Sequence, residues 1–259
     1  MMNILQLKNP FGAPVYHEEV LSSTFDAART LALHNEPHGT VITADFQEAG
    51  RGRQGRLWKA EKSKSLLFTI LLRYGDFSLI PAAITLRAGL AVSLALEEFI
   101  PSLKGDVKVK WPNDIMIGSR KAVGILSEAD GKNIFIGIGI NFSQTEFPEE
   151  HLSKAISLIQ AFPELNEDSR FILLEKILLY LYEEIECSNK PPNIMGWHSA
   201  LSDRLYKKGE KVNFALGPAG SELIISGNLK GIGPGGELLI IPEGEQKERA
   251  FVTGELKVY

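Results

Sequence analysis

The sequence has little of what cross-links a protein or anchors it in a membrane. It contains one cysteine, Cys187, among 259 residues, so a disulfide within the chain is excluded. Residues 1–12 hold no basic start followed by an apolar segment, and no uninterrupted apolar run is long enough to cross a bilayer. From these absences we expect a protein that stays in the reducing cytoplasm and has no membrane partner.

The spacing patterns of several common catalytic sites are also missing. Neither HExxH spacing nor cysteine partners accompany the five histidines, and neither a Walker A sequence nor a GxSxG elbow occurs. The charged glycine segment at residues 50–56 is not followed by a helical period, as a dinucleotide-binding fold would require. Zinc, P-loop, serine-nucleophile and Rossmann chemistry therefore have no support in the sequence.

Charge is nearly balanced over the chain but concentrated in one stretch. Lysine and arginine total 28 against 32 aspartate and glutamate, and this net charge of -4 does not favour binding to nucleic acid or to an anionic membrane. Residues 50–64, by contrast, contain six basic residues and one acid. Such a concentration indicates a local site for an anion rather than a general polyanion-binding surface.

The basic stretch begins with a glycine-rich loop, QEAGRGRQGRLW at residues 47–58, between apolar runs that predict strands. Its glycines allow the backbone to approach a ligand closely, and its arginines carry guanidinium groups suited to phosphate or carboxylate. Taken alone, an arginine-rich string of this kind is more often a solvated, flexible surface loop than a binding site. The residues concerned are Gly50, Gly52, Gly55, Arg51, Arg53 and Arg56.

A second polar cluster, KWPND at residues 110–114, follows an alternating strand pattern. Pro112 ends that strand and leaves Asn113 and Asp114 at its end, where an amide and a carboxylate can orient a nucleotide or hold Mg²⁺. An Asx-type turn is the alternative explanation for an isolated PND.

Three glycines interrupt the strands of two predicted hairpins, which cover residues 115–117, 121–129 and 133–140. Gly124, Gly137 and Gly139 weaken packing unless a flat group, such as a ring system or adenine, lies against the backbone. Bulges are the alternative. The predicted turns are Gly118-Ser119 and Asp130-Gly131.

Four motifs occur in one order: GRGRQGR at 50–56, KWPND at 110–114, KAVGIL at 121–126 and GIGIN at 137–141. Together they resemble the biotin protein ligases, the biotin–[acetyl-CoA-carboxylase] ligase family, whose pattern includes GRGRxGR, KWPND, K-x-x-GIL and GIGIN. The resemblance runs from residue 23 to residue 141 and extends more faintly through the glycine-rich C-terminal segment.

The resemblance implies an α+β fold with a mixed, largely antiparallel sheet flanked by helices, of the class II aminoacyl-tRNA synthetase and biotin ligase type. It also implies a small C-terminal SH3-like β-barrel, which agrees with short strands and glycine turns from about Lys207. We expect a catalytic biotin- and ATP-binding domain at 1–206 and the barrel at 207–259. Residues 1–20 leave no room for the DNA-binding helix-turn-helix of some family members, so a short form with no DNA partner is expected.

The implied activity is an ATP-dependent ligation in two steps. Biotin reacts with MgATP to give biotinyl-5′-AMP, and a lysine of the biotin carboxyl carrier domain of acetyl-CoA carboxylase or a related carboxylase then takes the acyl group. Biotin is the substrate, ATP and Mg²⁺ are co-substrate and metal, and no tightly bound prosthetic group is implied. Family members are monomers or homodimers, and the sequence does not choose between these states.

The resemblance also implies residue roles. Lys121 matches the lysine before GIL and is expected to bridge the biotin carboxylate and the α-phosphate, and Arg53 is the second predicted catalytic residue. The predicted biotin-binding residues are Ser23, Thr24, Gln47, Gly50, Arg51, Gly52, Arg53, Lys121, Gly124, Gly137 and Gly139. The predicted ATP-binding residues are Arg51, Arg53, Arg56, Trp58, Lys110, Asn113 and Asn141, and the predicted Mg²⁺ ligands are Asn113 and Asp114.

One residue departs from the pattern, because Phe25 stands where the family's Ser-Thr-Asn turn has asparagine.

Two other functions compete with biotin ligation. A lipoate ligase shares the fold and the adenylate logic, but the full GRGRxGR and KWPND motifs favour biotin. A non-catalytic RNA- or nucleotide-binding module would use the arginine loop, and the acidic net charge speaks against it.

Overall fold

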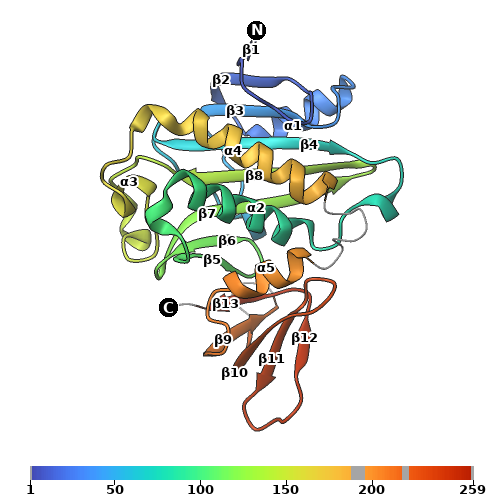
Figure 1. Cartoon of the computed structure of the whole chain (residues 1–259), viewed down its shortest axis with the longest axis vertical. Helices are drawn as coiled ribbons and strands as arrows, with labels where there is room; N and C mark the ends of the chain where they lie inside the picture. Colours follow the sequence, from blue (N-terminus) through green and yellow to red (C-terminus); the bar gives the residue numbers. More distant parts are fainter. Residues whose placement is uncertain (1, 188–195, 218–221, 258–259) are drawn as a thin grey trace.

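The computed structural model describes residues 2–187, 196–217 and 222–257 and contains two sheets (Figure 1). The larger sheet has eight strands in the order β1-β2-β3-β4-β8-β7-β6-β5. These strands are β1 (Asn3–Ile4), β2 (Val15–Leu21), β3 (Thr40–Gln47), β4 (Ser65–Arg73), β5 (Val107–Lys110), β6 (Asp114–Ile117), β7 (Arg120–Asp130) and β8 (Asn133–Asn141). The α-helices of the described residues are α1 (Thr24–Leu33), α2 (Ile84–Phe99), α3 (Leu158–Ala161), α4 (Arg170–Tyr182) and α5 (Gly196–Arg204).

Strand pairing in the larger sheet is mixed and largely antiparallel, as predicted. β2 runs parallel to β3, with Val15 opposite Val41, and the other neighbouring pairs are antiparallel. The local pattern of residues 1–20, which include Pro10, Gly12 and Pro14, predicts at most a short strand or a loop. The seven-residue β2 is longer, because it pairs with β3 along its length. The first hairpin turns at Gly118-Ser119 as predicted, but the second turns at Gly131-Lys132, since Asp130 already pairs with Asn133.

The two faces of the larger sheet carry separate apolar clusters, because successive side chains of a strand point to opposite faces. On β8, Ile134 and Ile136 belong to the cluster that includes α2 and α4, whereas Phe135 belongs to the smaller cluster of α1. Figure 1 shows α2 and α4 lying side by side across the sheet, and the two helices contact each other. The alternation therefore places the α1 face opposite the main core.

The α1 helix begins at a serine, a residue type that favours the N-cap position. Ser23 is its N-cap, with its hydroxyl accepting a hydrogen bond from the backbone N–H of Phe25 at 3.2 Å. Phe25 and Ala28 are buried against the sheet. The cap thus holds the segment 23–25 at the end of β3, where it takes part in the site described below.

The second sheet follows α5 and is antiparallel in the order β12-β11-β10-β9-β13. Its strands are β9 (Lys211–Leu216), β10 (Leu223–Ile232), β11 (Leu238–Pro242), β12 (Arg249–Phe251) and β13 (Glu255–Lys257). Trp111 joins the two sheets, since its indole N–H donates to the carbonyl of Gly236 at 2.9 Å and its ring lies 5.9 Å from that of Phe214. The sequence Asn-Lys-Pro-Pro at 189–192 predicts a break in the chain, and a short helix is expected to follow at 195–201. The break and Met195 lie outside the described residues.

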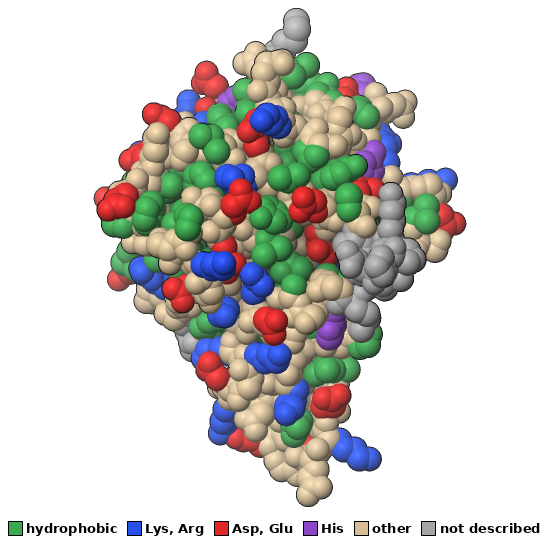
Figure 2. All heavy atoms as spheres, in the orientation of Figure 1, with side chains coloured by type: hydrophobic (Ala, Val, Ile, Leu, Met, Phe, Trp, Pro, Cys, Tyr) green, Lys and Arg blue, Asp and Glu red, His purple; other side chains and the backbone are tan. Residues whose placement is uncertain are grey.

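The outer surface agrees with the near balance of charge. On the face shown in Figure 2, acidic and basic side chains are interspersed with apolar ones, and no single sign of charge dominates. Within the described part of the chain, none of the helices combines the length and the apolar character that crossing a bilayer requires.

Candidate active site

The site is a cavity of about 840 Å³ on the α1 face of the larger sheet. Its walls come from the start of α1, the arginine loop, the strands β5 to β8, the segment 147–155 and the last strand, β13. All of the predicted site residues except Gly50 line this one cavity. Gly50 is buried beside it, where a Cβ atom would stand 2.5 Å from the carbonyl oxygen of Trp58.

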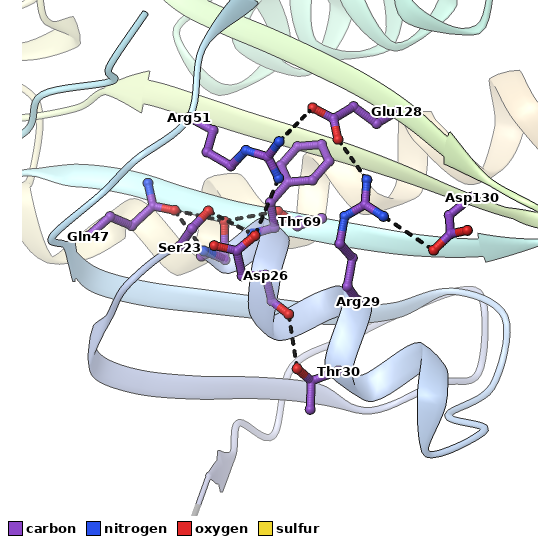
Figure 3. Close-up of polar contacts among 11 residues, drawn as sticks. Ser23, Asp26, Arg29, Thr30, Gln47, Arg51, Thr69, Glu128 and Asp130 are labelled. Carbon is purple, nitrogen blue, oxygen red and sulfur yellow. Dashed lines mark hydrogen bonds and ion pairs between the residues drawn. The ribbon is translucent and has the colours of Figure 1, made fainter. Parts of the chain in front are cut away.

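One end of the cavity is a polar corner at the N-terminus of α1 (Figure 3). Gln47 accepts hydrogen bonds through its Oε1 from the backbone N–H and the hydroxyl of Thr24, at 2.8 and 3.0 Å. Thr69 donates its hydroxyl to that of Thr24 at 2.9 Å. Because a backbone N–H can only donate, these bonds fix the orientation of the Gln47 amide.

The fixed orientation decides which groups this corner offers to a ligand. The Gln47 amide NH₂ is directed away from Thr24 and remains available as a donor, and the Ser23 hydroxyl, which accepts from Phe25, keeps its own hydrogen. The Thr24 oxygen donates once and accepts once, so it retains capacity to accept a second hydrogen bond. The corner therefore suits a small ligand group that carries both a carbonyl and N–H donors.

The predicted glycine strip lies between this corner and the other end of the cavity. A Cβ atom on Gly137 would stand 2.3 Å from the ring of Phe25, and one on Gly124 or on Gly139 would stand 2.6 Å from the indole of Trp58. A flat group does lie against these backbones, but in this structure it belongs to the protein's own aromatic side chains. The Trp58 Nε1 atom is buried and has no hydrogen-bond partner among the described residues.

The opposite end of the cavity holds two lysines around one carboxylate. The Nζ of Lys121 lies 2.6 Å from Asp114 Oδ1, and the Nζ of Lys110 lies 3.7 Å from Asp114 Oδ2. Burial lowers the pKa of Lys110, and the charge of Asp114 opposes this shift. A second anion entering here would favour the charged form of Lys110, so this end is suited to negatively charged groups.

The two predicted asparagines are bound by the protein itself. Asn141 donates to the carbonyls of Lys121 and Ile156 at 3.4 and 3.2 Å, so it holds β7 beside the segment that follows β8. Asn113 accepts from Arg53 at 3.1 Å and donates to the carbonyl of Ile125 at 2.8 Å. Both side chains line the cavity, and these bonds give each one a fixed position.

The predicted magnesium ligands fit a protein-held metal poorly. Both side-chain atoms of Asn113 are engaged, and the Asp114 carboxylate is balanced by two ammonium groups. The described residues contain no group of three or more His, Cys, Asp or Glu that could hold a metal ion. An ion bound mainly through phosphate oxygens and water needs only one or two protein carboxylates.

Two of the loop arginines connect the cavity to the second sheet. Arg53 donates to the carbonyl of Gly254 at 3.2 Å, and Arg56 binds both carboxylate oxygens of Glu255, at 3.2 and 2.8 Å. Burial raises the pKa of Glu255, but the hydrogen bond and charge of Arg56 outweigh it and leave the pKa below its usual range. Arg51 points elsewhere, toward Asp26 of α1.

The lining residues that were not predicted from the sequence include two groups that lie outside the motifs. One follows β8 and includes Phe147, His151 and Lys154, and the other is β13 with Glu255. Neither group carries a local motif. The first could have been suspected only because it follows GIGIN directly, and the second comes into the site solely through the packing of the two sheets.

Known proteins are similar to this chain in sequence and in fold. A model of the Biotin/lipoate A/B protein ligase family matches residues 18–141. The bifunctional ligase/repressor BirA of Salmonella typhimurium is 31% identical over 232 residues, which cover 85% of this chain and 67% of the relative. The BirA of Bacillus subtilis is 40% identical over 154 residues, or 57% of this chain and 46% of the relative.

A solved structure agrees over nearly the whole length. The biotin protein ligase from Aquifex aeolicus in complex with biotin and ATP has a TM-score of 0.77 at 28% identity, with 94% of this chain and 97% of that chain covered. The fold and the matched family model define a protein of the biotin and lipoate ligase class. Within that class, the chain belongs to the biotin protein ligase family. It spans about half the length of several curated relatives, such as 46% of the Bacillus subtilis and 50% of the Escherichia coli BirA.

The glycine strip leads to a first prediction. Gly139→Ala places a methyl group where the Trp58 ring lies, and overpacking of this kind costs about 1–3 kcal/mol. We expect the Gly139→Ala variant to have a lower free energy of unfolding. Its tryptophan emission should shift to the red as the indole of Trp58 moves outward. The same substitution made in a Trp58→Phe protein should cause no emission shift. Gly75→Ala is the control, because its Cβ would meet nothing within 4 Å. Equal stability and emission for the two alanine variants would contradict the packing role.

The Arg56–Glu255 pair leads to a second prediction, on pH. Because the pKa of Glu255 is depressed in the folded protein, its stabilisation is present above the ordinary carboxyl pKa of about 4.3 and is lost as the pH falls below it. Glu255→Gln should therefore lower the free energy of unfolding by about 1 kcal/mol at pH 7, a modest value because Arg56 is half exposed. Denaturant titrations should show this difference shrinking below about pH 4. A difference that persists at low pH would exclude the ionic contribution.

Proposed function

We propose that this chain is an ATP-dependent ligase that activates biotin as biotinyl-5′-AMP and transfers it to a lysine of a biotin carboxyl carrier domain. The observation that carries the proposal is the pairing, within one cavity, of a polar corner with mixed donors and acceptors and a cationic end around Asp114. The Aquifex aeolicus relative, which binds biotin and ATP, has the same fold over almost its full length.

The polar corner suits the ureido ring of biotin. The ureido carbonyl needs donors, which the Gln47 amide and the Ser23 hydroxyl provide, and the ureido N–H groups need an acceptor, which the Thr24 oxygen provides. The dithiolane ring of lipoate has neither carbonyl nor N–H and would leave these groups unpaired, at a cost of about 1–3 kcal/mol for each buried polar group. The corner therefore favours biotin over lipoate.

The cationic end suits the reaction of two anions. A carboxylate oxygen of biotin attacks the α-phosphorus of ATP, the new O–P bond forms and pyrophosphate leaves. We assign to Lys121, which is held by Asp114, the role of offsetting the repulsion between the carboxylate and the phosphate. Lys110 contacts the same carboxylate and is more deeply buried. No covalent nucleophile is needed, since the two substrates react directly once they are held together.

The arginine loop covers the reacting groups. Arg53 lies between Asn113 and Gly254, and burial lowers its pKa, so an approaching phosphate would favour its charged form. With Gly52 beside it, the loop excludes water from the mixed anhydride until the carrier lysine attacks the acyl carbon and AMP leaves. Trp58 forms a wall of the same space, and its buried N–H is a donor for a ligand oxygen.

We further propose how the metal, the domains and the carrier fit this activity. Magnesium enters with the nucleotide, and Asp114 is the nearest protein carboxylate to the lysines. We also propose the division into a catalytic domain at 1–206 and a C-terminal module at 207–259, with the module contributing Glu255 to the site. The carrier domain and a cytoplasmic location, where ATP is available, are proposed on the same grounds.

The proposal is tested by pyrophosphate release with MgATP and biotin, run beside lipoate and a control without acid. Biotin-dependent release, followed by transfer of the label to a lysine of a biotin carrier domain, is the expected outcome. Release with lipoate alone would retain the adenylate chemistry and overturn the substrate. Salt-sensitive RNA binding without release from either acid would favour the binding module instead.

Lys121 gives the most direct test of the mechanism. Lys121→Ala should reduce the rate of pyrophosphate release at least a hundredfold, since removing one preorganised electrostatic contact from an active site typically costs on the order of 10²–10³ in rate. Transfer from separately supplied biotinyl-5′-AMP should fall less. Met116→Leu, a volume-conserving change in the same wall, serves as the control. An unchanged rate of adenylate formation in Lys121→Ala would exclude the proposed role.

A further inference from the structure

Arg51 is the one loop arginine whose contacts lie at the polar end of the cavity (Figure 3). Its guanidinium Nη1 donates to Asp26 of α1 and its Nη2 donates to Glu128 of β7, each at 3.3 Å. The same guanidinium lies over the ring of Phe25, 5.6 Å from the ring centre. Arg51 thus joins the loop to a helix and to a strand on either side of the cavity's end.

The carboxylate that receives Arg51 is itself held in place. Glu128 also binds Arg29 of α1 at 2.7 Å, and Arg29 binds Asp130 at 3.2 Å. Two arginines and three carboxylates therefore form a connected network, in which Arg29 orients Glu128 whether or not the loop is present. Removing Arg51 would take the guanidinium away from Asp26 and leave Glu128 and Asp130 to share Arg29.

Phe25 forms the middle of a three-layer stack at this point. Its ring lies against the backbone of Gly137 on one side, where a Cβ atom would be only 2.3 Å away, and below the Arg51 guanidinium on the other. The ring lines the cavity and is 3% exposed. An asparagine at this position would be too small to fill the space between β8 and the loop, so the aromatic ring and the arginine together close this end.

We propose that Arg51 is a positioning residue. Its contacts with Asp26 and Glu128, called the brace below, hold the first half of the loop in place and close the polar end of the cavity, where the ring of the acid binds. The inference rests on the proposed function and deepens it. It assigns to Arg51 the retention of the acid and of its adenylate, separate from phosphate binding by Arg53. Phe25 is the surface against which the brace closes.

Loss of the brace should change the release rate of the adenylate and the KM for biotin. Each partly exposed ion pair changes an equilibrium constant by a factor of about 1.4 to 5, so loss of both should raise the release rate of the adenylate by about 2-fold to 25-fold. The KM for biotin should rise by a similar factor, while the KM for ATP stays within about twofold. Because the pairs are open to solvent, the difference from the wild type should shrink as salt is added.

The test uses Asp26→Asn, Glu128→Gln and their combination in the full chain, with Asp130→Asn as the matched control. Asp130 belongs to the same network but contacts Arg29 and not Arg51. Adenylate release is measured by chasing preformed biotinyl-5′-AMP with unlabelled biotin. Adding Arg51→Gln to the combined variant should cause little further change if the three residues act as one unit. Release rates in the combined variant equal to those of Asp130→Asn would overturn the brace.

A second readout does not depend on activity. The loop contains several trypsin sites between Arg51 and Lys64, and opening of the brace should speed cleavage there in the combined variant relative to Asp130→Asn at equal thermal stability. If the wild type released no pyrophosphate with either acid, the proposed function would fail, while the cleavage rates would still decide whether the brace exists. Equal cleavage in both proteins would count against it.

Discussion

The site depends on a sheet surface from which side chains are missing. Along β7 and β8 the residues that face the main core are large and aliphatic, whereas three of those facing α1 are glycines. The bare backbone admits the rings of Phe25 and Trp58 at distances that a methyl group would forbid. The same alternation that builds a closely packed core on one face therefore creates a cavity on the other.

Different helices and strands build the two ends of this cavity. The polar end is built from α1 and β3, whose hydrogen bonds fix the amide of Gln47, and the cationic end is built from β5, β6 and β7 around Asp114. The arginine loop lies across both ends. Its first arginine is held by carboxylates of α1 and β7, and the next two are held by Asn113 and by the end of the second sheet.

Much of this arrangement could be predicted from the sequence, because local sequence patterns determine it. The hairpins of β6 to β8 and the motifs at 50–56 and 110–114 are such patterns, and all of the residues predicted for the site except Gly50 line the cavity. The family resemblance supplied roles that spacing alone cannot give. Those roles remain predictions, whereas the gathering of the residues in one cavity is observed.

What the sequence could not show depends on contacts between distant segments. The strand β2 is specified by pairing with β3, and the turn after β7 is shifted by one residue because the ladder continues to Asp130. The glycine strip predicted a flat group against the backbone, but no local pattern shows that the rings of Trp58 and Phe25 lie there. Glu255 enters the site only because Trp111 and its neighbours pack the second sheet against the first.

The contact between Arg56 and Glu255 also has a consequence for how the protein is made. The two residues are 199 positions apart, so on a ribosome adding about 5–20 residues per second the loop emerges about 10–40 s before its carboxylate partner. Until β13 has been made, the cavity lacks the wall to which Glu255 belongs. Completion of the site is therefore a late event in biosynthesis, set by the arrival of β13 rather than by the motifs that precede it.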